Sequence, residues 1–131
     1  MVLTEEMMKI IAENRAYFAT ATADGVPNVV PIGNIKPLDN KTVLVADSYM
    51  IKTHANLEAN PKVAFVMHDA AKYPYQFKGS AKIYKTGDYY DQVVSWIKET
   101  APLAPKPKAA IVIDVEEIFS VKVGDAGKKL E

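Results

Sequence analysis

The sequence predicts an α+β protein that is mainly β: six to seven antiparallel strands that close into a small Greek-key barrel flanked by short helices. Short β-branched and aromatic runs dominate the middle of the chain, and turn signals join them into hairpins. The helical stretches between them are too few to supply the crossovers of a parallel sheet. Closing such a sheet into a barrel hides both of its edges. The 131 residues suit one domain spanning 1–131.

The first element is an amphipathic helix over residues 4–14, because Leu3, Met7 and Ile10 recur at helical spacing and Thr4 is a good N-cap. The boundaries of the remaining elements are predicted from turn and helix-breaking residues such as Asp24-Gly25 and Asn60-Pro61. We expect strands over 16–22, 28–36 and 42–46, a short helix over 50–60, strands over 63–67 and 75–85, a helix opened by Thr86-Gly87-Asp88, and a final strand pair over 109–115 and 118–123. Gly79 indicates a bulge or a close backbone approach, and the tail over 124–131 is expected to be loose.

Composition excludes several classes of protein. Sixteen basic residues balance sixteen acidic ones, and Arg15 is the only arginine, so we expect no nucleic-acid binding. The absence of cysteine excludes disulfides, thiolate metal sites and a cysteine nucleophile. No signal pattern or apolar run of membrane-spanning length is present, so we expect a cytoplasmic protein with no membrane association.

Standard catalytic motifs are also missing. The chain has neither a GxGxxG nor a GxxxxGK[ST] motif, and no GxSxG sequence supports a serine nucleophile. His54, His68 and Asp69 are the available set for a metal site, although isolated histidines are more often structural or exposed. We therefore expect no metal and nominate no catalytic side chain.

The most informative segment runs from residue 46 to residue 53, where a strand ends and a short helix begins. The first turn of a helix offers unpaired N–H groups to an anion, and Lys52 and Thr53 add an ammonium and a hydroxyl there. The segment therefore suits a terminal phosphate. The alternative is that Lys52 is a solvated surface residue and that Thr53 or Ser48 only caps the helix.

A second irregular segment lies in the strand over 28–36. Pro31 removes a ladder donor and Gly33 leaves backbone uncovered, so main-chain groups here can read the edge of a flat heterocycle. A simple bulge explains the same residues equally well. The tyrosines fit the core or a dimer interface better than they fit a cofactor stack.

As a whole, the chain resembles the FMN-binding split-barrel family related to pyridoxamine 5'-phosphate oxidase, and in particular its small single-domain FMN-binding proteins. The resemblance is carried by AYFATATADGVPNVVPI after the first helix, by IKTHANLEANPKVAFVM, by QFKGSAKIY and by AAIVIDVEEIFSV near the end. It implies a split β-barrel that forms a homodimer, with FMN in a groove at the interface.

The resemblance also implies roles for individual residues. Lys52 and Thr53 would hold the FMN phosphate, and Ser48 and Asp47 would line its approach. The remaining cofactor-binding residues that it implies are Val30, Pro31 and Ile32 facing the isoalloxazine, with Asn34 from the same strand and Lys78 beside Gly79 on a later one.

The resemblance implies a flavin-dependent oxidoreductase or an electron-transfer protein that serves a redox partner protein or a small-molecule substrate. The alternative is a split-barrel module that binds heme or another flavin-like cofactor without enzymatic activity. Pyridoxamine 5'-phosphate oxidase activity itself is not expected, because it needs further arginine and histidine contacts that a chain with one arginine does not supply.

Overall fold

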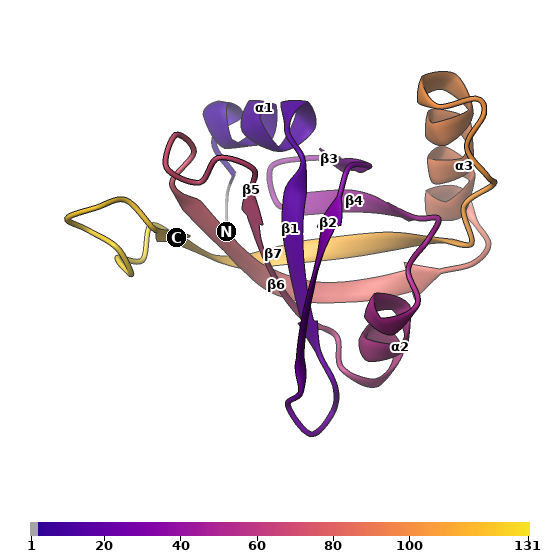
Figure 1. The fold of residues 1–131 in the computed structure, drawn as a ribbon. Coiled ribbons are helices and arrows are strands. Elements are labelled where there is room, and N and C mark those ends of the chain that lie inside the picture. The colour runs from indigo at the N-terminus through magenta and orange to yellow at the C-terminus, as the bar shows by residue number, and fades with distance from the viewer. Residues whose placement is uncertain (1–2) are drawn as a thin grey trace.

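The computed structural model describes residues 3–131, which form one curled antiparallel sheet with three helices packed around it (Figure 1). The elements are α1 (Glu5–Glu13), β1 (Ala16–Ala21), β2 (Pro27–Ile32), β3 (Ile35–Pro37), β4 (Thr42–Asp47), α2 (Lys52–Ala59), β5 (Lys62–Met67), β6 (Tyr75–Tyr84), α3 (Asp88–Thr100) and β7 (Ala109–Ser120). The seven strands lie in the order β2-β1-β5-β6-β7-β4-β3. The predicted mainly β fold is therefore confirmed, as a half-barrel.

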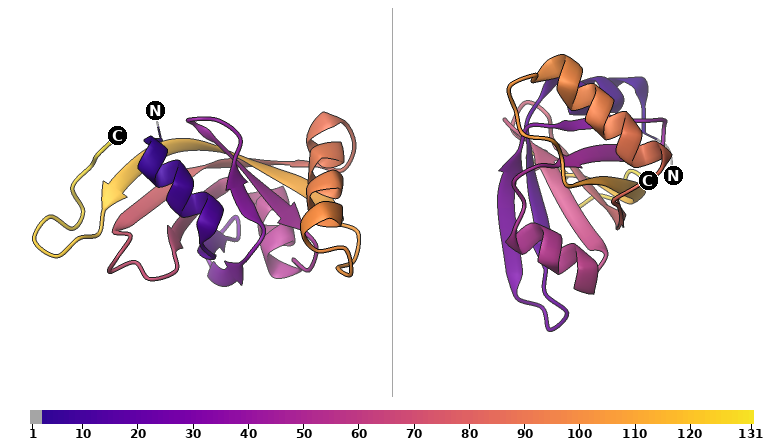
Figure 2. Two further views of the ribbon diagram at one scale, coloured as in Figure 1. Left: turned by 90° about the horizontal axis from the view of Figure 1, so that it is seen from above. Right: turned by 90° about the vertical axis from the view of Figure 1, so that its right-hand side faces the viewer.

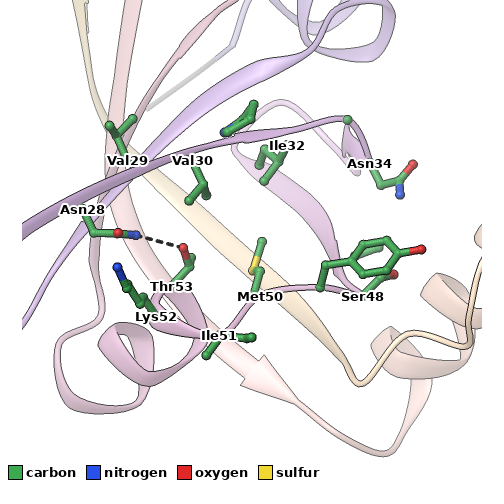
Figure 3. Close-up of a pocket in the computed structure, with 14 residues that line it drawn as sticks. Asn28, Val29, Val30, Ile32, Asn34, Ser48, Met50, Ile51, Lys52 and Thr53 are labelled. Carbon is green, nitrogen blue, oxygen red and sulfur yellow. Dashed lines mark hydrogen bonds between the residues drawn. The ribbon is translucent and has the colours of Figure 1, made fainter.

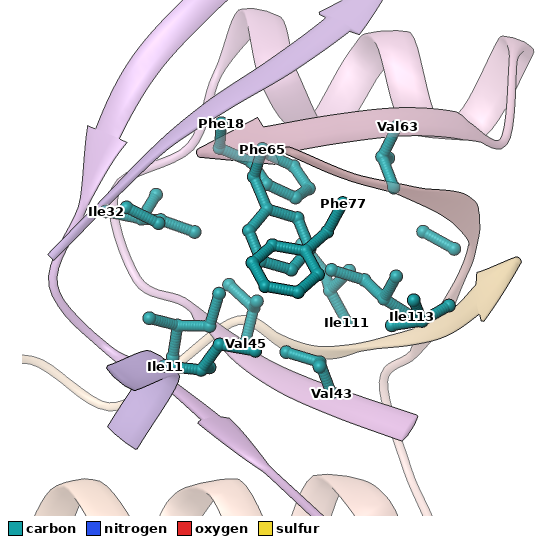
Figure 4. Close-up of a cluster of buried hydrophobic side chains, with 14 of the residues drawn as sticks. Ile11, Phe18, Ile32, Val43, Val45, Val63, Phe65, Phe77, Ile111 and Ile113 are labelled. Atoms are coloured by element: carbon teal, nitrogen blue, oxygen red, sulfur yellow. The ribbon is translucent and has the colours of Figure 1, made fainter. Parts of the chain in front are cut away.

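The main core lies inside the curl of the sheet (Figure 4). Phe65 and Phe77 stack with their ring centroids 5.0 Å apart, and Phe18 packs beside Phe65. Helix α1 adds its buried face, including Ile10 and Ile11, to the same cluster. Burial of this apolar area is the main term that stabilises the fold.

Helix α3 covers the other face of β4 and β7, at the opposite end of the molecule from the C-terminal tail (Figure 2). In β4, Val43 and Val45 belong to the main core, whereas Leu44 and Ala46 pack with Val93 of α3. The uninterrupted apolar run of this strand is thus explained, because both of its faces are buried.

The strand expected over 28–36 is two strands, β2 and β3. β2 pairs with β1 and β3 pairs with β4, so the two lie at opposite edges of the sheet. The chain must leave one edge at Gly33 to reach the other, and Ala46 N donates to Asn34 O at 3.1 Å where it arrives. A continuous strand could not make both pairings.

The prediction of two final strands over 109–115 and 118–123 is also wrong. The structure has a single strand there, β7, which contains a bulge. Lys78 pairs with Glu117 and Gly79 with Val115, which leaves Glu116 as the extra residue. The close approach predicted at Gly79 is confirmed, since a Cβ there would lie 2.1 Å from the carbonyl oxygen of Asp114.

The tail over 124–131 was expected to be loose, but it folds back and forms backbone hydrogen bonds with the end of β7. Ser120 N donates to Lys128 O at 2.8 Å, and Leu130 N donates to Ile118 O at 2.7 Å. These bonds satisfy backbone groups on the outer portion of β7. Across residues 3–131, no helix combines the length and apolarity needed to cross a membrane.

Candidate functional site

A groove of about 530 Å³ lies between β2 and the segment that joins β4 to α2 (Figure 3). Its middle is apolar, with Val30 and Ile32 on one side and Met50 on the other, and each of its ends is polar. Asn28, Lys52 and Thr53 form one end, and Asn34 and Ser48 form the other. The groove therefore suits an elongated ligand with an apolar body and polar groups at both ends.

The first polar end is built by the start of α2. The N-cap position is Ile51, and no side chain caps the helix, so the first N–H groups of α2 are left for a ligand. Thr53 is 2% exposed and accepts a hydrogen bond from Asn28 Nδ2 at 3.1 Å, which leaves its own hydroxyl hydrogen to donate. Lys52 is exposed beside it. The alternative in which Thr53 or Ser48 caps this helix is therefore not what the structure contains.

The second polar end contains a buried hydroxyl without a partner. Ser48 Oγ is shielded from solvent, and nothing in the described part of the chain forms a hydrogen bond with it. Such groups are rare in folded proteins and commonly mark a place where a ligand or water binds. Asn34, which follows β2, lines the groove at the same end.

Asp47 does not line the groove. Its side chain is fully buried behind the groove wall, where it accepts a hydrogen bond from Met50 N at 3.2 Å and one from the ring of His54 at Nδ1. The ammonium of Lys108 lies 3.8 Å from its other side, at Oδ1. The strand-end position of Asp47 was predicted, but its burial depends on His54, seven residues further on in α2, and on Lys108, which is distant in the sequence.

Lys78 also lies outside this groove. It is exposed on β6, with its ammonium 5.4 Å from the ring centroid of Phe119. The other predicted binding residues all line the groove: Val30, Pro31, Ile32, Asn34, Ser48, Lys52 and Thr53. Sequence reasoning missed Asn28 and Met50, although both lie in the two segments that it singled out. Only the approach of the β4–α2 segment to β2 shows that they line one groove.

The rim of the groove carries exposed apolar side chains. Val29 is 65% exposed, Tyr49 74% and Ile51 80%. Single exposed apolar residues are ordinary, but three around one groove form a patch. The patch continues the apolar middle of the groove onto the surface of the molecule.

The two histidines are held by separate partners. His54 contacts Asp47, whereas His68 Nδ1 lies 2.9 Å from the hydroxyl of Tyr17 on β1. Between residues 3 and 131, no group of three potential metal ligands comes together.

A family comparison matches residues 3–122 to the model of pyridoxamine 5'-phosphate oxidase. The chain belongs to this family. A protein of Methanocaldococcus jannaschii with no characterised function is 43% identical over 129 residues, which cover 96% of this chain and 86% of that protein. The match spans both the groove and the core.

Solved structures give the same result. HupZ of Group A Streptococcus is 31% identical with a TM-score of 0.83, covering 95% of this chain and 98% of that one. A putative pyridoxamine 5'-phosphate oxidase of Lactobacillus delbrueckii is 26% identical with a TM-score of 0.71, covering 91% and 94%.

More distant structures share the fold. They include an FMN-binding protein of Syntrophomonas wolfei, 19% identical with a TM-score of 0.68 over 88% of this chain and 84% of that one. A heme storage protein of Vibrio cholerae is 20% identical with a TM-score of 0.67 over 92% and 95%.

Proposed function

We propose that the protein binds FMN noncovalently in the groove between β2 and α2 and acts as a flavin-dependent oxidoreductase or electron-transfer protein. The observation that carries the proposal is the distribution of groups along the groove, which is apolar in the middle and polar at both ends. FMN has a matching distribution, with a phosphate at one end and polar ring edges beyond an aromatic body. Family membership and the FMN-binding protein of the same fold support this choice of ligand.

The phosphate belongs at the α2 end in this proposal. A helix N-terminus favours an anion through its free N–H groups and its dipole, and Lys52 supplies a full positive charge. Thr53 is oriented by Asn28, so its hydroxyl is held in place before the ligand arrives. Hydrogen bonds to a charged group contribute about 1.5–3 kcal/mol each.

The ring system lies over Val30, Pro31 and Ile32 in this proposal. Ser48 and Asn34 would form hydrogen bonds with its polar edge, and the buried hydroxyl of Ser48 would gain the partner that it lacks. Bound flavin supplies the redox chemistry. The chain's own residues bind and orient it and exclude water from the face that lies on β2.

A second copy of this chain completes the site. The exposed side chains of Val29, Tyr49 and Ile51 surround a groove that is open on one side, and a partner would bury both them and the ring. Lys78 lies outside the groove of its own chain, with its ammonium over the ring of Phe119. We propose a cytoplasmic homodimer that exchanges electrons with a partner protein or a small-molecule substrate.

Heme is the second candidate, because a heme storage protein has the same fold. Tyr49 and Met50 are the groove residues that would hold the heme iron, since His54 and His68 are both bonded elsewhere and do not line the groove. Heme also has no single phosphate to match the α2 end.

The test is a titration of the ligand-free protein with FMN, riboflavin and heme, followed by flavin fluorescence and by visible absorption. We expect FMN to bind at least tenfold more tightly than riboflavin, and both more tightly than heme. Preferential binding of heme, or equal affinity for the two flavins, would contradict the proposal. Turnover assays with NADH or NADPH as reductants then separate an enzyme from an electron carrier.

A further inference from the structure

Four titratable side chains form a cluster at the junction of β4 and α2, which we call the Asp47 cluster: Asp47, His54, Glu58 and Lys108. The carboxylate of Asp47 is fully buried at its centre. It accepts hydrogen bonds from the backbone N–H of Met50 and the ring of His54, and it lies 3.8 Å from the ammonium of Lys108. A buried carboxylate is tolerated only when it is paired in this way.

Lys108 joins the cluster from a remote part of the sequence. Its backbone N–H donates to Asp47 O at 2.7 Å, and its ammonium donates to the carbonyl oxygen of Met50. Its side chain is 48% exposed, so it does little to fill the core. The ammonium of Lys108 therefore pairs with the Asp47 carboxylate and bonds to the backbone of the groove wall at Met50.

The position of the carboxylate matters because of the anion proposed above. Asp47 bonds to Met50, which itself lines the groove, and α2 begins two residues later. An unpaired negative charge at this point would repel a phosphate at the start of α2, and the repulsion would be strong because the intervening medium is protein. The same charge would have little effect on a neutral ligand.

In the described part of the chain, the other charged side chains near the cluster form no hydrogen bond or ion pair with Asp47. Glu58 Oε1 lies 3.4 Å from His54 Nε2, and Lys82 and Lys85 line the same hollow as Glu58 from the β6 side. The strands β1 and β2 present Thr20 and Asn28 to α2, and neither side chain titrates. His54 and Lys108 are thus the two groups that face the Asp47 carboxylate directly.

We propose that Lys108 and His54 are positioning residues, Lys108 balancing the charge of Asp47 with its ammonium and His54 donating a hydrogen bond to it. In this proposal, the pairing lets the groove select a flavin that carries a phosphate over one that does not. The inference rests on the proposed function and assigns the phosphate selectivity partly to residues outside the groove. Lys108 and His54 act through Asp47 and not by touching the ligand.

The experiment compares FMN and riboflavin binding by the full chain in four forms: wild type, Lys108→Met, Asp47→Asn and the double variant. Lys108→Met should weaken FMN binding about tenfold and change riboflavin binding less than twofold. Asp47→Asn keeps an acceptor for Met50 and should bind FMN at least as tightly as wild type. The double variant should recover the FMN affinity lost in Lys108→Met.

The control is Lys106→Met, which removes a lysine two residues away whose ammonium lies 5.9 Å from the ring centroid of Tyr90, and which should leave both affinities unchanged. The same FMN and riboflavin titrations are repeated with His54→Leu, alone and combined with Asp47→Asn, because His54 contacts the second oxygen of the same carboxylate. Thermal unfolding verifies that each variant is folded.

Three outcomes would overturn the inference while leaving the proposed function intact. Equal losses for both flavins in Lys108→Met would mean that its role is structural. Failure of Asp47→Asn to restore binding would mean that Lys108 touches the phosphate itself. An unchanged FMN affinity in Lys108→Met would mean that Asp47 needs no neutralisation. A wild-type protein that binds both flavins equally would instead overturn the proposed function, and this inference with it.

Discussion

Individual residues of the groove differ in how freely they can be replaced. Lys52 is exposed and contributes its charge, whereas Thr53 is buried and contributes a hydroxyl held by Asn28. Gly79, which does not line the groove, contributes only the absence of a side chain. Each of these properties can be removed by a single substitution.

Lys52→Ala should weaken FMN binding by about one to two decades, because a charge-assisted bond contributes roughly 1.5–3 kcal/mol. Riboflavin binding should be unaffected, since riboflavin has no phosphate. Fluorescence titration of both ligands measures this. Lys62→Ala is a matched control, because Lys62 is 71% exposed on β5 and does not line the groove. Equal losses for both flavins would place the phosphate elsewhere.

Gly79→Ala should destabilise the protein by about 1–3 kcal/mol, the usual cost of forcing extra atoms into a packed region. The new Cβ would clash with the Asp114 carbonyl at 2.1 Å, and both groups are backbone-linked and cannot move aside. Gly33→Ala is the control, because nothing lies within 4 Å of a Cβ there. Urea unfolding should give a lower midpoint for Gly79→Ala only; similar midpoints would contradict the close packing of β6 on β7.

At the scale of elements, the helices have separate roles. Helix α1 closes the core, α3 covers the outer face of β4 and β7, and the start of α2 forms one end of the groove. The stability of α1 depends on its N-cap, because Thr4 Oγ1 accepts a hydrogen bond from Met7 N at 3.1 Å. Helix α2 lacks such a cap, which suits an element that keeps its first N–H groups for a ligand.

Thr4→Ala should lower the free energy of unfolding by about 1 kcal/mol, because the Met7 N–H loses its partner. Thr4→Ser keeps the hydroxyl and should be close to wild type. Chemical denaturation followed by circular dichroism compares the three proteins. FMN affinity should not change, and a parallel loss of affinity would show that α1 is coupled to the groove.

At the scale of the whole molecule, we expect a homodimer. The apolar side chains on the groove rim, Val29, Tyr49 and Ile51, are exposed in the single chain, and a second copy would cover them and keep water from the bound ring. Sedimentation should therefore give about twice the mass of the 14.4 kDa chain at micromolar concentration. Ile51→Glu should shift the protein toward the monomer and weaken FMN binding. Leu103→Glu, at a fully exposed position after α3, should do neither. A monomer that binds FMN would contradict the shared groove.

Local signals in the sequence were sufficient for most elements. The Thr4 cap, the apolar spacing of α1, the Asp24-Gly25 turn and the break at Pro61 each act over a few residues, and the helices and strands they predict are present. The junction at Lys52 and Thr53 was predictable for the same reason, since the end of one strand and the start of the next helix are adjacent in the chain.

Tertiary structure decided the rest, because it depends on segments that are remote in sequence. β2 and β3 separate because they pair with different strands, and β7 stays whole because Gly79 of β6 accommodates its bulge. The burial of Asp47 requires His54 and Lys108 to arrive from two other segments. Sequence alone could place Asp47 at the end of a strand; only the packing of α2 and β7 around it determined that its charge is paired inside the protein.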